Sequence, residues 1–190
     1  MESVKKNYRN FDVAVYCRVY DVKKMADSDW LEKSFSEISR YLKMDKVYIE
    51  TFRDMILADK ELVLKIKEFF SSRGVKVSGA LCTVMDERDR MRTFCYSNPE
   101  HLEKLREMVK HTAELFDEII LDDYFFTNCK CKLCIKAKGD ESWTTYRLKQ
   151  LTKAAEIVIK TARQVNPDIN LIIKYPNWYE HYQFQGYNLD

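Results

Sequence analysis

The sequence predicts an α/β fold of the (β/α)8 TIM-barrel type, with only about the first five β-α units present in this chain. Five short apolar runs alternate with amphipathic helical segments, which is typical of parallel strands joined by right-handed crossovers. The chain has only four glycines and none directly follows the first strand, so the phosphate-binding turn of a doubly wound sheet is missing. Polar and aromatic residues instead follow the strand ends, where barrel active sites lie.

The length sets the extent of the predicted barrel. A complete barrel takes about 250 residues, whereas this chain has 190. We therefore expect a lead-in at residues 1–10 and a partial barrel over residues 11–190, either as a fragment or with its open edge covered by other means. The predicted strands are the apolar runs at residues 12–17, 46–50, 75–81, 118–122 and 170–175.

The first two predicted helices have clear start and stop signals. Asp27, Ser28 or Asp29 opens the first helix. Its apolar side chains recur at steps of four, three and four residues, at Leu31, Phe35, Ile38 and Leu42. Asp59 opens the second helix, and Gly74 provides a left-handed stop after it.

The third and fourth helices follow a long charged connection that runs from Cys82 to Ser97. Asn98 is the expected N-cap of the third helix with Pro99 at its first position, and Ser97 with Glu100 forms a candidate capping box. The fourth helix runs from about residue 141 to just before residue 166. The charged stretch at residues 86–92 is most simply a solvated loop, although its arginines could approach a ligand.

Composition indicates a reduced, water-soluble protein. The 32 basic and 30 acidic residues nearly cancel, so neither nucleic acid nor an anionic membrane is an expected partner. No apolar run approaches the roughly 20 residues of a membrane helix, and the first six residues lack the apolar core of a secretion signal. We therefore expect a cytoplasmic location, provided that no signal precedes this sequence.

Asp122 and Asp123 close the fourth predicted strand. Successive strand side chains point to opposite faces, so only one of the two is expected to face the barrel axis. The aromatic residues at 124–126 follow directly, and a carboxylate held against aromatic rings has its charged form disfavoured, as a proton donor requires. A helix-capping or salt-bridged pair is the alternative interpretation.

Other strand ends carry candidate ligand-binding residues. Arg18 and Tyr20 follow the first strand, and Glu50 and Arg53 follow the second. Each of these residues alone is more typical of an ion pair than of a site. Their shared location is the observation that counts, because the ends of barrel strands converge on one opening.

The fifth strand is followed by an aromatic and polar segment at residues 174–182. Lys174, Trp178 and Glu180 belong to it. Flat aromatic faces interleaved with hydrogen-bonding groups suit a sugar, whose C–H face stacks while its hydroxyls pair. A packed loop with surface aromatics is an equally good interpretation.

The cysteines are clustered rather than spread as a disulfide framework. Cys129, Cys131 and Cys134 lie within six residues and can wrap one tetrahedral ion, with a fourth ligand from elsewhere. Cys95 is the best candidate for that ligand and Cys82 the reserve. Zinc is the default metal for an all-sulfur site, and such a closed site is structural. Three free thiols on a loop are the alternative.

Three segments together resemble uncharacterised glycoside-hydrolase-like barrels: residues 120–134, residues 47–54 and residues 172–180. There is a more distant similarity to metal-containing barrel β-galactosidases, whose C-x-C-x-x-C run and one upstream cysteine bind zinc. This resemblance implies zinc at Cys129, Cys131 and Cys134 with Cys95, and an acid/base role for Asp123 or Asp122. The chain has Asp-Asp where those enzymes carry Asn-Glu, and their nucleophile comes from a later strand that this chain does not contain.

These observations lead to a glycosidase hypothesis. Asp123 would be the proton donor, and Asp122 or Glu50 would bind sugar hydroxyls, with the second carboxylate on later strands. A catalytically inactive, zinc-stabilised carbohydrate-binding barrel fragment is the alternative. A third hypothesis is a fragment that self-associates into a homo-oligomer through its open sheet edge.

Overall fold

The structure is a computed structural model of the chain, and it describes residues 8, 10–123 and 127–174. Its centre is a sheet of five parallel strands, all of which the sequence predicted. The strands are β1 (Ala14–Cys17), β2 (Lys46–Arg53), β4 (Lys76–Cys82), β7 (Glu118–Asp122) and β8 (Asn170–Lys174). A short strand, β3 (Ile56–Leu57), pairs antiparallel with the end of β2.

The strands lie in the sheet in the same order as in the chain, β1-β2-β4-β7-β8. A doubly wound sheet reverses its order at a switch point, and the described strands show no such reversal. Right-handed crossovers in one direction place the connecting helices on one face of the sheet. The arrangement is consistent with a TIM-like α/β fold.

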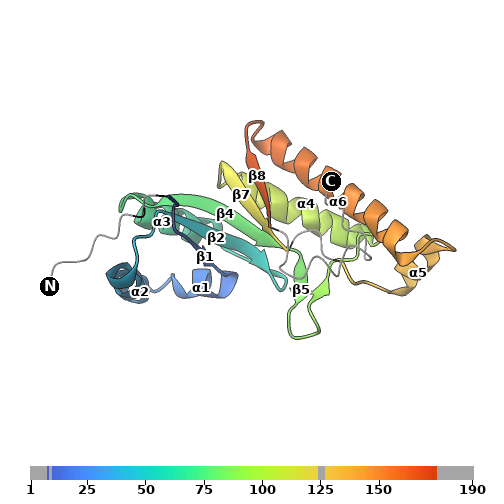
Figure 1. Cartoon of the computed structure of the whole chain (residues 1–190), viewed down its shortest axis with the longest axis horizontal. Coiled ribbons are helices and arrows are strands. Elements are labelled where there is room, and N and C mark those ends of the chain that lie inside the picture. Colours follow the sequence, from blue (N-terminus) through green and yellow to red (C-terminus); the bar gives the residue numbers. More distant parts are fainter. Residues whose placement is uncertain (1–7, 9, 124–126, 175–190) are drawn as a thin grey trace.

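Six helices occur in the described residues, and Figure 1 shows α2 at one end of the molecule and α5 at the other. Their bounds are α1 (Val19–Lys24), α2 (Ser28–Tyr41), α3 (Lys60–Ser71), α4 (Pro99–Ala113), α5 (Lys132–Lys138) and α6 (Trp143–Val165). The sequence did not predict α1 and α5, which are short.

Three expected helix starts are confirmed. Asp27, Asp59 and Asn98 each accept a backbone N–H of the first turn of α2, α3 and α4. The predicted capping box of Ser97 and Glu100 was wrong. The Ser97 hydroxyl contacts Tyr146 and Gln150 instead. Gly74 has a φ of 74°, as a left-handed stop requires.

Alternate residues of each strand face the helices and form the core. Four side chains on this face are fully buried, those of Val47, Ile49, Leu81 and Ile119. Gly79 of β4 lies close to Thr112 on α4 and to Phe116, which follows α4. A Cβ atom at this position would lie 2.6 Å from the Phe116 ring and 2.9 Å from the Thr112 methyl group.

The connection from Cys82 to Ser97 is not the extended charged loop that was expected. It contains an antiparallel hairpin of β5 (Val84–Asp86) and β6 (Arg92–Thr93). Residues that flank the hairpin are buried, among them Thr83 and Phe94. Apolar residues at 84 and 94–96 explain the difference, since they anchor the connection while the charged tip stays outside.

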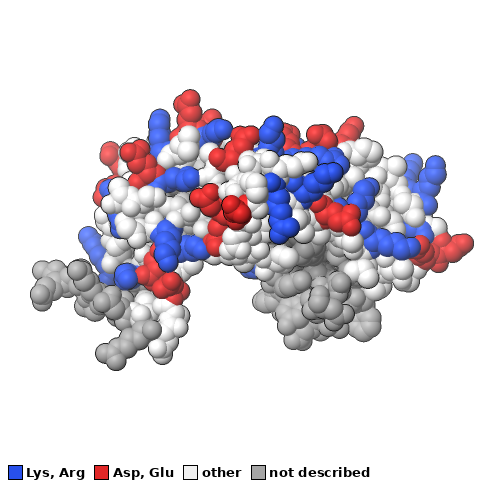
Figure 2. Space-filling model, turned by 90° about the horizontal axis from the view of Figure 1, so that it is seen from above, with Lys and Arg blue, Asp and Glu red and all other residues white. Residues whose placement is uncertain are grey.

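Acidic and basic side chains are interspersed over the face of the molecule in Figure 2. Of the helices in the described part of the chain, none is both long and apolar enough to cross a bilayer.

Candidate active site and metal centre

A cavity of about 470 Å³ lies against the sheet face opposite the helices and extends to the strand ends. We call it the strand-end pocket. Its sides are apolar and aromatic where the strands form them, and charged at the strand ends. The lining residues are Ala14, Tyr16, Arg18, Tyr48, Arg53, Glu87, Met91, Ile120, Asp122, Asp123 and Lys174.

Asp122 and Asp123 both line the strand-end pocket, which corrects the expectation that strand alternation turns one of them away. The reason is local backbone geometry. β7 ends at Asp122, and Asp123 has a left-handed φ of 46°, so the alternation does not continue past the strand. Lys174 Nζ contacts both carboxylates, at 2.5 Å from Asp122 Oδ1 and 3.2 Å from Asp123 Oδ1.

Arg53 is the centre of a buried ion-pair network. β2 runs to Arg53 rather than ending at Glu50, so both residues belong to the strand and not to a following loop. Nε of Arg53 lies 2.8 Å from Glu50 Oε1, and Nη2 lies 2.6 Å from Asp122 Oδ2. Nη1 lies 2.5 Å from Glu87 Oε1. Its side chain, 5% exposed, thus faces three carboxylates.

Glu50 is fully enclosed beneath the pocket. Its oxygens also accept the Tyr16 hydroxyl and the Val19 backbone N–H, each at 2.7 Å. Burial raises the pKa of Glu50, while Arg53 and the other donors oppose that shift. All of its visible partners are internal, so we assign Glu50 to holding Arg53 rather than to contacting a ligand.

The first strand end contributes Arg18 and Tyr20. Arg18 lines the pocket and pairs with Glu87, while its buried Nε has no hydrogen-bond partner in the described structure. Tyr20 donates its hydroxyl to Asp54 and is 37% exposed. Lys174, at the end of β8, completes this group. Trp178 and Glu180, the other expected binding residues, lie outside the described residues.

The two aspartates differ in their surroundings. Burial raises the pKa of Asp123, and the neighbouring Asp122 carboxylate adds to the effect, with Lys174 and Arg53 opposing. Asp122 is held by Arg53 and Lys174 together. The arrangement therefore places a carboxylate that two cations hold beside one whose pKa is raised.

Glu87, Tyr16 and Tyr48 line the strand-end pocket but were not among the expected site residues. Glu87 lies in the charged stretch that was interpreted as a solvated loop. The sequence contains one feature that could have pointed to Glu87, the long connection after the third parallel strand. Such connections build the binding surface of a barrel. Nothing in the sequence singles out Glu87 from its charged neighbours.

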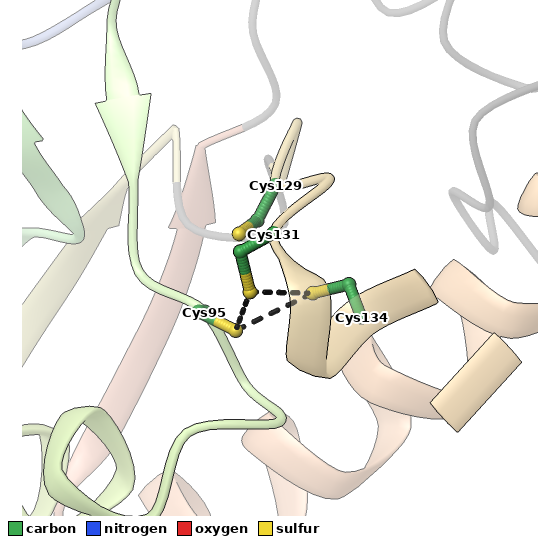
Figure 3. A group of neighbouring side chains, drawn as sticks. All are labelled: Cys95, Cys129, Cys131 and Cys134. Carbon is green, nitrogen blue, oxygen red and sulfur yellow. Dashed lines mark hydrogen bonds between the residues drawn. The ribbon is translucent and has the colours of Figure 1, made fainter. Parts of the chain in front are cut away.

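A second site is formed by four cysteines, Cys95, Cys129, Cys131 and Cys134, whose sulfur atoms converge (Figure 3) and all lie within 4.8 Å of one another. Cys95 Sγ is 3.3 Å from Cys134 Sγ and 3.6 Å from Cys131 Sγ. A tetrahedral ZnS4 centre with Zn–S bonds of about 2.3 Å separates its sulfurs by about 3.8 Å. The thiols thus fit a closed four-sulfur metal site. Cys82, the reserve candidate, is instead buried at the end of β4.

The four cysteines come from two separate segments of the chain. Cys95 follows β6, and the other three belong to the segment that opens α5. The Cys95 backbone N–H donates to His101 Nδ1 at 2.8 Å, so His101 on α4 fixes this loop. Hydrogen bonding from Cys95 lowers the pKa of Cys129 well below its usual value, which favours the thiolate that a metal needs.

Comparison with known proteins shows to which family the chain belongs. A family model described as "Probable glycosyl hydrolase, catalytic domain" matches residues 1–190. The chain belongs to this family. No solved structure matches it significantly.

One relative of this glycosyl hydrolase domain is an uncharacterized protein of Saccharolobus solfataricus. It is 26% identical over 187 residues, an alignment that covers 83% of this chain and 31% of the relative. The chain therefore spans about a third of the length of the curated relative that it matches.

Proposed function

We propose that this domain takes part in the hydrolysis of glycosidic bonds, with Asp123 as the proton donor to the leaving oxygen. The observation that carries the proposal is the buried aspartate pair at the end of β7, of which Asp122 is bound by two cations and Asp123 has a raised pKa. A general acid must keep its proton near the working pH, and burial beside a second carboxylate has this effect.

The rest of the strand-end pocket supports a carbohydrate ligand. Tyr16 and Tyr48 offer aromatic faces, and Asp122, Lys174 and Arg18 offer groups that pair with hydroxyls. The unpartnered Nε of Arg18 is a donor for a ligand oxygen. Tyr20, Trp178 and Glu180 are proposed to extend this surface. Arg53 lines the pocket and positions Asp122, and Glu50 holds Arg53 from beneath.

The second carboxylate is proposed to come from another part of a closed (β/α)8 barrel, of which this chain supplies about five units. A separation of about 5 Å between the two carboxyl groups would give retention of anomeric configuration, and a clearly wider one would give inversion. The four cysteines are proposed to bind one structural zinc ion, which would join the β6–α4 connection to α5 beside the pocket.

Substitution of the two aspartates tests the proposal. In the protein that contains the rest of the barrel, Asp123→Asn should lower turnover of a responsive glycoside by about 10²–10⁴-fold with little change in binding. Asp122→Asn should weaken binding as well, because it removes the partner of Lys174 and Arg53. Asp168→Asn, an exposed aspartate before β8, is the matched control. Turnover that survives Asp123→Asn would refute the role of Asp123.

The second candidate is a carbohydrate-binding domain without activity. Arg18, Arg53 and Lys174 form ion pairs with the aspartates and Glu87, and a static binding site can contain the same ion pairs. A protein that contains this domain with the rest of the barrel, binds oligosaccharides by calorimetry and turns over none of a broad glycoside panel would favour this candidate.

A further inference from the structure

Glu87 joins three separate connections at the rim of the strand-end pocket. Its Oε1 lies 2.5 Å from Arg53 Nη1, at the end of β2, and its Oε2 pairs with Arg18 Nη2, at the end of β1. Its backbone N–H donates to Asp54 Oδ1 at 3.0 Å, and the other Asp54 oxygen accepts the Tyr20 hydroxyl. Glu87 itself belongs to the β5–β6 hairpin, directly after β5.

The tip of this hairpin has few other attachments within the described residues. Its base is held by the Asp54 N–H, which donates to the Val84 carbonyl at 3.0 Å. Near the tip, Asn128 Nδ2 reaches the Arg90 and Met91 carbonyls only at 3.4 and 3.5 Å. Arg90 and Met91 both have left-handed φ angles, 48° and 56°, which residues other than glycine adopt at a cost in backbone strain.

We propose that Glu87 is a positioning residue, which holds the β5–β6 hairpin against the rim of the strand-end pocket and sets the orientation of Arg53 toward Asp122. The hairpin thereby forms one wall of the pocket, to which Met91 contributes, and limits the width of the sugar that can enter. The proposal rests on the proposed function for the identity of the ligand, but the clamp itself is a property of the protein alone.

Charge is the physical reason that this residue must be acidic. Arg18 and Arg53 both direct a guanidinium group at the Glu87 carboxylate. With a neutral side chain between them, the two cations repel each other, and hydrogen bonds to a charged acceptor are replaced by weaker neutral ones. Glu87→Gln keeps the shape of the residue and removes only this charge.

Proteolysis tests the clamp without any ligand. Trypsin cleaves after Arg88, Arg90 and Arg92, all in or beside the hairpin tip. In Glu87→Gln, cleavage at these sites should be about tenfold faster than in wild type, because opening of the tip becomes easier. The matched control is Glu103→Gln, which removes a surface ion pair of α4 with Arg106 and should leave cleavage unchanged. Equal cleavage of Glu87→Gln, Glu103→Gln and wild type would overturn the proposal.

A second variant covers the case in which Glu87→Gln does not fold. Arg18→Gln removes one partner of the clamp from outside the hairpin and should also speed cleavage at the three arginine sites. If folded Arg18→Gln protein is cleaved as slowly as wild type, Glu87 does not hold the hairpin through Arg18.

The link through Arg53 has its own measurement. Asp123 faces Asp122, Lys174 and Arg53, and the charge of Arg53 lowers its pKa. If Glu87 orients Arg53, Glu87→Gln releases the guanidinium from the aspartates, so the pKa of Asp123 should rise in this variant and stay unchanged in Glu103→Gln. Titration of the aspartate carboxyl carbons by NMR measures this, and no change, or the fall that loss of the Glu87 charge alone would cause, would overturn the positioning of Arg53. Both readouts need no glycoside, so inactivity on all glycosides of the protein that contains the rest of the barrel refutes the proposed function and not the clamp.

Discussion

Arg53 Nη2 lies 2.6 Å from Asp122 Oδ2, which joins β2 to β7 across the end of β4. The same guanidinium binds Glu50, so one buried cation neutralises carboxylates from two strands. This contact connects the core to the strand-end pocket, because Glu50 lies beneath the pocket and Asp122 lines it. Changes at Arg53 should therefore affect stability as well as ligand binding.

Arg53→Met should lower the free energy of unfolding by about 3–5 kcal/mol, because it leaves Glu50 buried without its charge partner. Urea denaturation at neutral pH measures the loss. The control is Arg106→Met, which breaks an exposed i,i+3 pair with Glu103 and should cost less than about 0.5 kcal/mol. Equal losses in the two variants would mean that the buried network does not stabilise the fold.

Asp123→Asn should make the domain more stable at neutral pH. The folded-state pKa of Asp123 is raised, so its contribution to stability is fully present below the unfolded value of about 3.9 and is lost as pH rises through the folded pKa. Asparagine is uncharged at every pH and also tolerates the left-handed φ of this position. The advantage of the variant should therefore shrink on acidification.

Unfolding of wild type and Asp123→Asn at pH 7 and at about pH 4 checks this dependence. Asp168→Asn serves again as the exposed control, and its difference from wild type should stay small at both values. A stability gain for Asp123→Asn that is the same at both pH values would contradict a raised pKa.

Cys131→Ser should abolish metal binding at the four-cysteine site. Purified wild type is expected to carry about one zinc ion per chain, and elemental analysis should find almost none in the variant. Cys17→Ala is the control. Cys17 lies on β1 in the hydrophobic core, so its substitution should not change the zinc content. Wild type that carries no zinc after expression in zinc-supplemented medium would refute the metal centre.

Gly79→Ala should destabilise the fold by about 1–3 kcal/mol through overpacking. The added methyl group would lie 2.6 Å from the Phe116 ring, which must shift together with α4. Chemical denaturation measures the effect, with Lys76→Ala, an exposed position on the same strand, as the control. Unchanged stability would show that α4 can move away from the sheet at little cost.

The sequence by itself determined the five strands and four long helices, because apolar periodicity and capping residues act over a few neighbouring positions. Asp27, Asp59, Asn98 and Gly74 could be identified for this reason. Cysteine spacing also predicted a metal site at Cys129, Cys131 and Cys134, with Cys95 as the preferred fourth ligand and Cys82 in reserve. The structure places Cys95 with the other three.

Only the tertiary structure decided how the strand-end pocket is assembled. The left-handed φ of Asp123 and the extension of β2 to Arg53, where it pairs with β3, became visible only in the structure. The ion pairs of Glu87 with Arg18 and Arg53 join residues that lie 69 and 34 positions apart in the sequence. Local patterns do not encode such contacts, because a charged residue has the same local preferences whether it meets solvent or a buried partner. The ion pairs that turn separate strand ends into one site exist only once the parallel strands lie side by side.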